Sequence, residues 1–287
     1  MKLTFFQNPV FLTACMISGI VIVVLAIQFI HLEVSQKTNS GALINALPRH
    51  ENRIIKETSR LEDSDSTDFW LNSGAVFYEQ KEYSRTLHGD LSAYSRWRLL
   101  YNSSNPVDTD NGYHPQNVFR LITRIPKQNA SQQMYFMVTH DNLSASPNRN
   151  ESNGVFLLNR YKDGNNLYYV GIRVDGTAVI KKKSSGIYHT LAQTSLFEGD
   201  RYNKNINPNL IPKNKWIGIR TEVENISSNA VNIQMYVDKN NTGDWKEILE
   251  AVDTSSSDVP AFLNAGFGGI RTDFMDILFK EYTFSTI

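Results

Sequence analysis

The stretch Gly154–Arg173, GVFLLNRYKDGNNLYYVGIR, decides the fold class of this chain. Two runs rich in aliphatic and aromatic side chains stand on either side of a polar tetrapeptide, Lys162–Asn165. Its Asp163-Gly164 pair suits a tight turn, because aspartate and glycine tolerate the left-handed backbone that short hairpins require. We therefore predict two antiparallel strands joined by a hairpin.

Residue patterns typical of β-strands continue on both sides of this hairpin. From Lys215 to Glu224 and from Val231 to Val237, apolar and polar residues alternate, which gives each strand one buried and one wetter face. Similar runs recur along the chain at Ala75–Tyr78, Trp97–Tyr101, Val118–Ile125, Gln133–Thr139, Val155–Arg160, Leu167–Val174, Ala178–Lys183, Tyr188–Ala192, Trp245–Glu250 and Phe274–Phe284. No long amphipathic helix interrupts them, so we predict an all-β fold, an antiparallel β-sandwich of the jelly-roll type over residues 68–287.

The last of these runs predicts a local irregularity. Ile277 and Phe279 have the spacing of core residues, and Tyr282 and Phe284 resume that pattern one position out of phase. The intervening Lys280-Glu281 pair therefore predicts a β-bulge.

Composition narrows the classes of function. The chain has 287 residues, with 29 basic and 29 acidic side chains and a formal net charge of 0. A balanced charge argues against a dedicated nucleic-acid binder, which needs a basic face. One cysteine excludes an internal disulfide framework and any multi-cysteine metal site.

The N-terminal region predicts a membrane anchor. Val10–Ile30, VFLTACMISGIVIVVLAIQFI, is an uncharged run of 21 residues, long enough as a helix to cross a hydrocarbon core of about 30 Å. Lys2 is the only charge before it, which favours a cytoplasmic N-terminus. We expect residues 1–9 in the cytoplasm, 10–30 in the bilayer as a signal anchor, 31–67 as a flexible stalk, and the sandwich outside the cytoplasm, in the periplasm or at the cell surface.

Cys15 leaves a second form of anchoring open. Leu12-Thr13-Ala14-Cys15 is similar to a bacterial lipoprotein box, which would make Cys15 an acylated N-terminus. The apolar run continues for 15 residues beyond Cys15, where a lipoprotein turns polar, so the spanning helix is favoured. Either form makes the lipid bilayer a partner.

The order of the strand-like runs resembles the concanavalin A-like lectin/glucanase superfamily, which includes laminin G-like domains and polysaccharide-active jelly rolls. The matching segments are Gly154–Tyr161 with Asn166–Arg173, Ala178–Lys182 with Thr190–Ala192, Trp216–Val223 with Ile233–Asp238, and Gly266–Arg271 with Phe274–Phe279. The resemblance implies a sandwich and a saccharide or polysaccharide partner. It does not specify an activity, because the superfamily includes lectins, hydrolases, lyases and adhesion modules.

Two enzymatic alternatives follow from that resemblance. The acidic cluster of its glycoside hydrolases, Glu-x-Asp-x-x-Glu, does not occur between residues 68 and 287. Its lyases use an Arg, a Gln or Asn, a His and a Tyr to neutralise a uronate and move a proton. Alternation places Gln116 and Arg120 on one face, close to Tyr113 and His114. The predicted ligand-binding residues are Tyr113, His114, Gln116, Arg120, Arg160, Tyr168 and Arg173.

Glycan binding needs exposed aromatic rings together with polar donors and acceptors. Tyr113, Tyr161, Tyr168, Tyr169, Tyr188 and Trp245 are the candidate rings, and the candidate loops are the Asn-rich segments Asn102–Tyr113 and Asn142–Asn153. Alternation also places Lys181 and Lys183 on one face, where they either contact an anionic polymer or lipid headgroup or are simply solvated.

One structural calcium ion is a further hypothesis. Asp238 and Asn240 begin a segment, Asp238–Asp244, with oxygen side chains before a glycine, as in the first half of a calcium loop. The bidentate glutamate of such a loop is missing, and a plain hairpin turn explains the segment equally well. The resemblance adds Asp276, because many sandwiches of the superfamily hold calcium near the closing strand.

These observations predict a membrane-anchored, extracytoplasmic β-sandwich that binds a polysaccharide or glycan of the cell envelope. A polysaccharide lyase or glycoside hydrolase is the first alternative. A protein-binding adhesion or structural module is the second.

Overall fold

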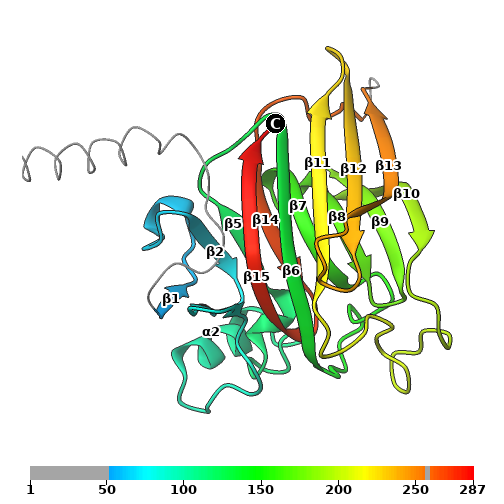
Figure 1. The fold of residues 1–287 in the computed structure, drawn as a ribbon. Coiled ribbons are helices and arrows are strands. Elements are labelled where there is room, and N and C mark those ends of the chain that lie inside the picture. Colours follow the sequence, from blue (N-terminus) through cyan, green and yellow to red (C-terminus); the bar gives the residue numbers. More distant parts are fainter. Residues whose placement is uncertain (1–51, 256–258) are drawn as a thin grey trace, which may run out of the picture. The chain divides into compact units, whose positions relative to one another are not determined.

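The computed structural model describes residues 52–255 and 259–287, which form two antiparallel β-sheets packed face to face (Figure 1). Within these residues, sheet A contains eight strands in the order β1 (Arg53–Lys56), β3 (Val76–Glu79), β4 (Ser84–Arg85), β15 (Met275–Thr286), β6 (Ala130–Asp141), β11 (Ile217–Asn225), β12 (Ala230–Asp238) and β13 (Lys246–Thr254). Sheet B contains seven, in the order β10 (Ile187–Ser195), β9 (Thr177–Ser184), β8 (Asn166–Arg173), β7 (Gly154–Asp163), β14 (Phe267–Thr272), β5 (Arg120–Thr123) and β2 (Phe69–Ser73). The predicted antiparallel sandwich is confirmed.

Alternation along the strands divides sheet B into an inner and an outer face. In β7, Val155 and Leu157 join the main core between the sheets, whereas Phe156 and Leu158 join a second apolar cluster on the outer face. The predicted hairpin is also present, because β7 and β8 pair from Gly154 opposite Arg173 to Asp163 opposite Asn166. This second cluster forms the base of the candidate site described below.

The predicted bulge in the closing strand is confirmed. The register between β15 and β6 shifts between Lys280 and Thr283, and Glu281 has a left-handed φ of 53°. The extra residue returns Tyr282 to the core, where it is fully buried together with Phe279.

One predicted strand is a helix. Trp97–Tyr101 belongs to α2 (Arg96–Ser104), and the two aromatic rings of that segment pack with Ala75 and Leu87 in a small cluster. The error has a simple cause: Trp97 and Tyr101 are four residues apart, which places them on one face of a helix. The predicted strand Val118–Ile125 begins later, because Pro115–Val118 forms the 3-10 helix η2.

The folded unit begins before residue 68. Within the segment expected to be stalk, β1 pairs with β3, and Ile55 lies in the main core with no exposed surface. A second 3-10 helix, η1 (Leu61–Asp63), follows, and the side chains of Ser64 and Ser66 are buried. The structure therefore places residues 53–67 in the sandwich domain.

The rest of the N-terminal predictions, residues 1–9, 10–30 and 31–51, lie outside the described residues. In the described part of the chain, no helix is both long and apolar enough to cross a membrane.

A buried ion pair connects the two sheets. The ammonium of Lys182 on β9 lies 2.8 Å from the carboxylate of Asp253 on β13, and the Lys182 side chain is 1% exposed. Tyr168 donates its hydroxyl proton to the same carboxylate. Burial raises the pKa of Tyr168, and the charge of Asp253 acts in the same direction. The phenol therefore remains a neutral donor.

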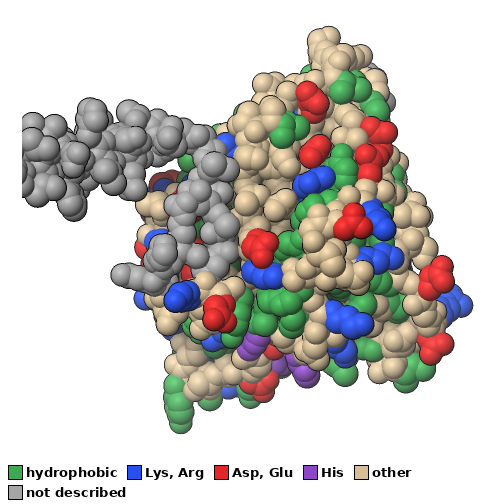
Figure 2. Space-filling model, in the orientation of Figure 1, with side chains coloured by type: hydrophobic (Ala, Val, Ile, Leu, Met, Phe, Trp, Pro, Cys, Tyr) green, Lys and Arg blue, Asp and Glu red, His purple; other side chains and the backbone are tan. Residues whose placement is uncertain are grey.

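The exposed face of sheet A carries charges of both signs. Lys and Arg side chains are interspersed with Asp and Glu over the described residues in this view (Figure 2). The arrangement agrees with the balanced composition and offers no basic track for a nucleic acid on this face.

Candidate functional site

A cleft of about 500 Å³ lies on the outer face of sheet B. Its floor carries Phe156 of β7, Tyr169 of β8, Lys181 of β9 and Arg271 of β14. These four strands are neighbours in the sheet, and the register pairs Phe156 with Arg271 and Tyr169 with Lys181. Side chains that alternate outward from adjacent strands therefore converge on one surface.

Gly171 makes room for the aromatic floor. A Cβ atom at this position would lie 2.1 Å from the carbonyl oxygen of Val155 and 2.9 Å from Cδ1 of Phe156. The absence of a side chain therefore lets the Phe156 ring settle against the sheet, where its centroid is 6.0 Å from that of Tyr169.

Tyr188 and Thr190 of the edge strand β10 form one rim of the cleft. Tyr188 is 52% exposed, and its ring lies 5.8 Å from the ring of Tyr169. Tyr169 itself is almost fully buried and receives a hydrogen bond from Arg271 at 3.3 Å. The cleft therefore presents one accessible aromatic ring next to two enclosed ones.

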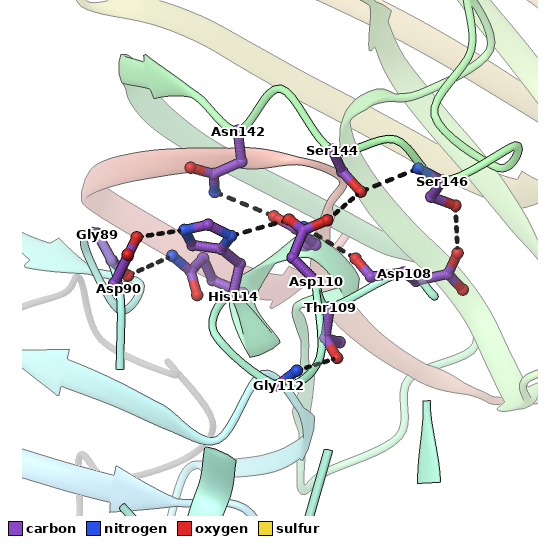
Figure 3. Close-up of polar contacts among 12 residues, drawn as sticks. Gly89, Asp90, Asp108, Thr109, Asp110, Gly112, His114, Asn142, Ser144 and Ser146 are labelled. Atoms are coloured by element: carbon purple, nitrogen blue, oxygen red, sulfur yellow. Dashed lines mark hydrogen bonds and ion pairs between the residues drawn. The ribbon is translucent and has the colours of Figure 1, made fainter. Parts of the chain in front are cut away.

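The opposite wall is built from two loops that hydrogen-bond to each other (Figure 3). Asp108 accepts hydrogen bonds from Ser146 at 2.6 Å and Asn148 at 2.9 Å, and Asp110 accepts one from Ser144 at 2.6 Å. Asp108 and Asn148 line the cleft. The network fixes these polar groups in place before any ligand arrives.

The cations of the cleft differ in how they are paired. Arg173 and Arg271 each lie 2.8 Å from a carboxylate, that of Asp175 and that of Asp273. In the described part of the chain, Lys181 has no hydrogen bond or ion pair, and its ammonium lies 6.0 Å from the centre of the Phe156 ring.

The environment of Lys181 opposes its charge. Burial lowers the pKa of Lys181 to about 8, and the neighbouring guanidinium group of Arg173 also lowers it. Asp273 and Asp175 act in the opposite direction without restoring the usual value. Lys181 is therefore a cation whose charge the protein itself leaves poorly compensated.

The two carboxylates that line the cleft are arranged as acceptors. Burial acts to raise the pKa of Asp108, but hydrogen bonds from Ser146, Asn148 and Asn105 outweigh it and lower that pKa. Asp273 accepts from Arg271 at 2.9 Å. A general acid for glycoside cleavage needs a raised carboxyl pKa, and the hydrogen bonds to Asp108 act in the opposite direction.

Of the predicted ligand-binding residues, Arg173 lines the cleft. His114 lies elsewhere, with its ring nitrogens 2.9 Å from Asp110 and 2.7 Å from Asp90 (Figure 3). Tyr113 is covered by the guanidinium of Arg98, 3.5 Å from the ring centre.

Gln116 and Arg120 do not share the strand face that alternation predicted. Gln116 lies in η2, fully buried, and donates to Asp276 at 3.0 Å. Arg120 is opposite Arg271 in the β5–β14 ladder but does not line the cleft. The prediction was wrong because the helical turn before β5 breaks the period of two.

Arg160 and Tyr168 are buried structural residues. Arg160 donates to the carbonyl oxygen of Phe262 at 2.6 Å and to Asn225 at 3.0 Å, and burial lowers its pKa to about 10. Tyr168 is fully buried between the sheets. Of the adjacent tyrosines, it is therefore Tyr169 that reaches the cleft.

The carboxylates of the predicted calcium ligands Asp238 and Asp276 accept hydrogen bonds within the protein. Asp238 already accepts hydrogen bonds from the backbone N–H groups of Asn240, Thr242 and Gly243 at 2.6–3.0 Å, which is the plain hairpin turn. Asp276 belongs to a different strand of sheet A and accepts from Gly89 and Asn142 as well as Gln116. In residues 52–255 and 259–287, no three His, Cys, Asp or Glu side chains converge as a metal-binding group.

Sequence reasoning missed Asp108, Asp273 and Arg271 as cleft residues. The sequence did indicate the loops that form one wall of the cleft, since Asp108 and Asn148 lie in the two Asn-rich segments predicted to bind glycans. The pairing of β14 with β7, which brings Arg271 and Asp273 to the site, joins segments more than 100 residues apart. No local pattern reports such a contact.

No protein-family model and no curated protein sequence matches the chain. Similar solved structures include carbohydrate-binding module CBM66 from Bacillus subtilis, with 12% identity, 77% of this chain and 98% of that chain covered, and a TM-score of 0.47. Another is the exoplasmic/lumenal domain of VIP36 in its Ca²⁺-bound form, with 10% identity, coverage of 84% and 92%, and a TM-score of 0.43. A third is the GH43 protein BlXynB from Bacillus licheniformis, with 10% identity, 71% of this chain but 33% of that chain covered, and a TM-score of 0.39. All three TM-scores are below 0.5.

Proposed function

We propose that this protein binds a saccharide in the cleft on sheet B without cleaving it. The observation that carries the proposal is the combination, in one cavity of about 500 Å³, of an exposed tyrosine ring with fixed carboxylate, amide and guanidinium groups. Sugar rings bury their C–H faces on aromatic rings and exchange hydrogen bonds through their hydroxyls, so they need both kinds of surface together.

Three features favour binding over catalysis. Among the described residues that line the cleft there is no histidine. Its two lining carboxylates are held as acceptors, Asp273 by Arg271 and Asp108 by three neutral donors. The lyase constellation expected around His114 and Gln116 is not assembled, because those side chains are committed to structural hydrogen bonds.

The first test is glycan binding by the full-length protein purified in detergent. Tyr188→Ala should weaken binding of any glycan identified by array about tenfold, because an interface tyrosine commonly contributes more than about 1 kcal/mol. Tyr94→Ala is the matched control, since Tyr94 is 95% exposed and lies outside the cleft. Absence of binding to every glycan offered, or equal affinity of the Tyr188→Ala variant, would refute the proposal.

We also propose that the domain works outside the cytoplasm, tethered to a membrane. The support is the uncharged run Val10–Ile30 with Lys2 as the only preceding charge. The expected result is that the full-length chain stays with membranes after extraction at alkaline pH, while protease added outside sealed cells or spheroplasts digests it. Recovery in the soluble fraction, or full protection from protease, would contradict this location.

A further inference from the structure

We infer that the saccharide taken by the cleft is acidic, with its carboxylate or sulfate group placed on the ammonium of Lys181. This inference rests on the proposed function and specifies the class of saccharide. It derives from the way the charges of the cleft are distributed.

Lys181 is the cation of the cleft that the described structure leaves without a partner. Arg173 and Arg271 each form an ion pair with a carboxylate 2.8 Å away. Lys181 lies on the floor in β9, opposite Tyr169 of β8 on one side and Thr190 of β10 on the other. Lys181 is half-buried, and an ammonium withdrawn from water is expected to be paired, so an anion from a ligand would complete this site.

The low pKa of Lys181 also favours an acidic ligand. Burial and the positive charges of Arg173 and Arg271 lower the pKa of Lys181 to about 8, against the pull of Asp175 and Asp273. A bound anion would reverse part of that shift. Binding energy is then gained specifically by an acidic ligand, because a neutral one leaves the ammonium unpaired.

The charges on the two sides of the cleft favour one orientation of the bound saccharide. Asp108 is kept ionised by its hydrogen bonds and belongs to the loop wall, so it repels an acidic group and accepts from sugar hydroxyls. Tyr188 and Thr190 form the rim on the side of Lys181. The acidic substituent is therefore directed toward β9 and β10, and the neutral hydroxyls toward the loops.

The experiment compares matched acidic and neutral probes on the full-length protein. The carboxylate pair is trigalacturonic acid and its methyl ester, and the sulfate pair is a sulfated galactan oligosaccharide and its desulfated form. The expected result is a preference of about tenfold or more for the acidic member of at least one pair. The pair that shows this preference identifies the acidic group.

Variants assign the preference to Lys181. Lys181→Met should reduce this ratio of acidic to neutral affinity to less than about twofold. Lys162→Met, which removes an exposed lysine outside the cleft, should leave it unchanged. The wild-type preference should also decline as pH rises through about 8, where Lys181 loses its proton, and this decline should be absent in Lys181→Met.

The outcomes separate the two claims. Equal or tighter binding of the neutral probes, or an acidic preference that survives Lys181→Met, would overturn the inference and leave saccharide binding intact. Failure of every probe and every arrayed glycan to bind would remove the proposed function, and the inference with it.

Discussion

Lys182→Met is expected to lower the free energy of unfolding by about 3–5 kcal/mol, because it leaves the carboxylate of Asp253 buried without its cation. The Lys182 side chain is 1% exposed and its ammonium lies 2.8 Å from that carboxylate. Tyr168 would still donate to Asp253, but one neutral hydrogen bond does not replace a paired charge. Urea unfolding of the full-length protein, followed by tryptophan fluorescence, measures the change.

Two further variants test the cause. Lys183→Met changes the adjacent residue, which points to the outer face and donates to the carbonyl oxygen of Gly164, and should cost less than about 1 kcal/mol. The double variant Lys182→Met/Asp253→Leu should regain most of the loss, since apolar residues often replace a buried ion pair at little cost. Wild-type stability of Lys182→Met would show that the pair does not hold the sheets together.

Gly171→Ala is expected to destabilise the domain by about 3 kcal/mol and to abolish glycan binding. The new Cβ would lie 2.1 Å from the carbonyl oxygen of Val155, so β8 must move away from β7. It would also displace Phe156 from the floor of the cleft. Urea unfolding and glycan affinity, measured on the same preparation, test the two effects together.

Gly199→Ala is the matched control for this substitution. A Cβ at Gly199 meets its nearest neighbour, a Leu210 methyl carbon, at 3.9 Å, which is ordinary contact. This variant should unfold and bind as the wild type does. If Gly171→Ala also unfolds and binds as the wild type does, the close approach of β7 and β8 does not determine the structure of the cleft floor.

The fold was predictable because its signals are local. The Asp163-Gly164 turn and the alternation along Ile217–Asn225 specify strands and faces without knowledge of distant residues. The errors occurred where local signals compete. Trp97 and Tyr101 favour strands by residue type, but their spacing of four residues fits the face of a helix, and packing against Ala75 and Leu87 decides for the helix.

The site was less predictable because it depends on which strands become neighbours. Tyr168 and Tyr169 are adjacent residues of the same type, so the sequence does not distinguish them. Alternation along β8 turns Tyr168 toward Asp253 on β13, in the interior, and turns Tyr169 toward the cleft. His114 and Gln116 have the residue types of a catalytic site, but both side chains form hydrogen bonds with carboxylates inside the domain, those of Asp110 and Asp276. Residue type alone does not distinguish these roles.

The position of β15 has a consequence for how the protein is made. This strand lies inside sheet A, pairing with β6 along most of its length and with β4 on its other side. Neither neighbour can be completed until the ribosome has released residues 275–286. The nascent chain therefore carries an unpaired β6 edge until that strand emerges, and an unpaired strand edge can pair with another chain in this interval.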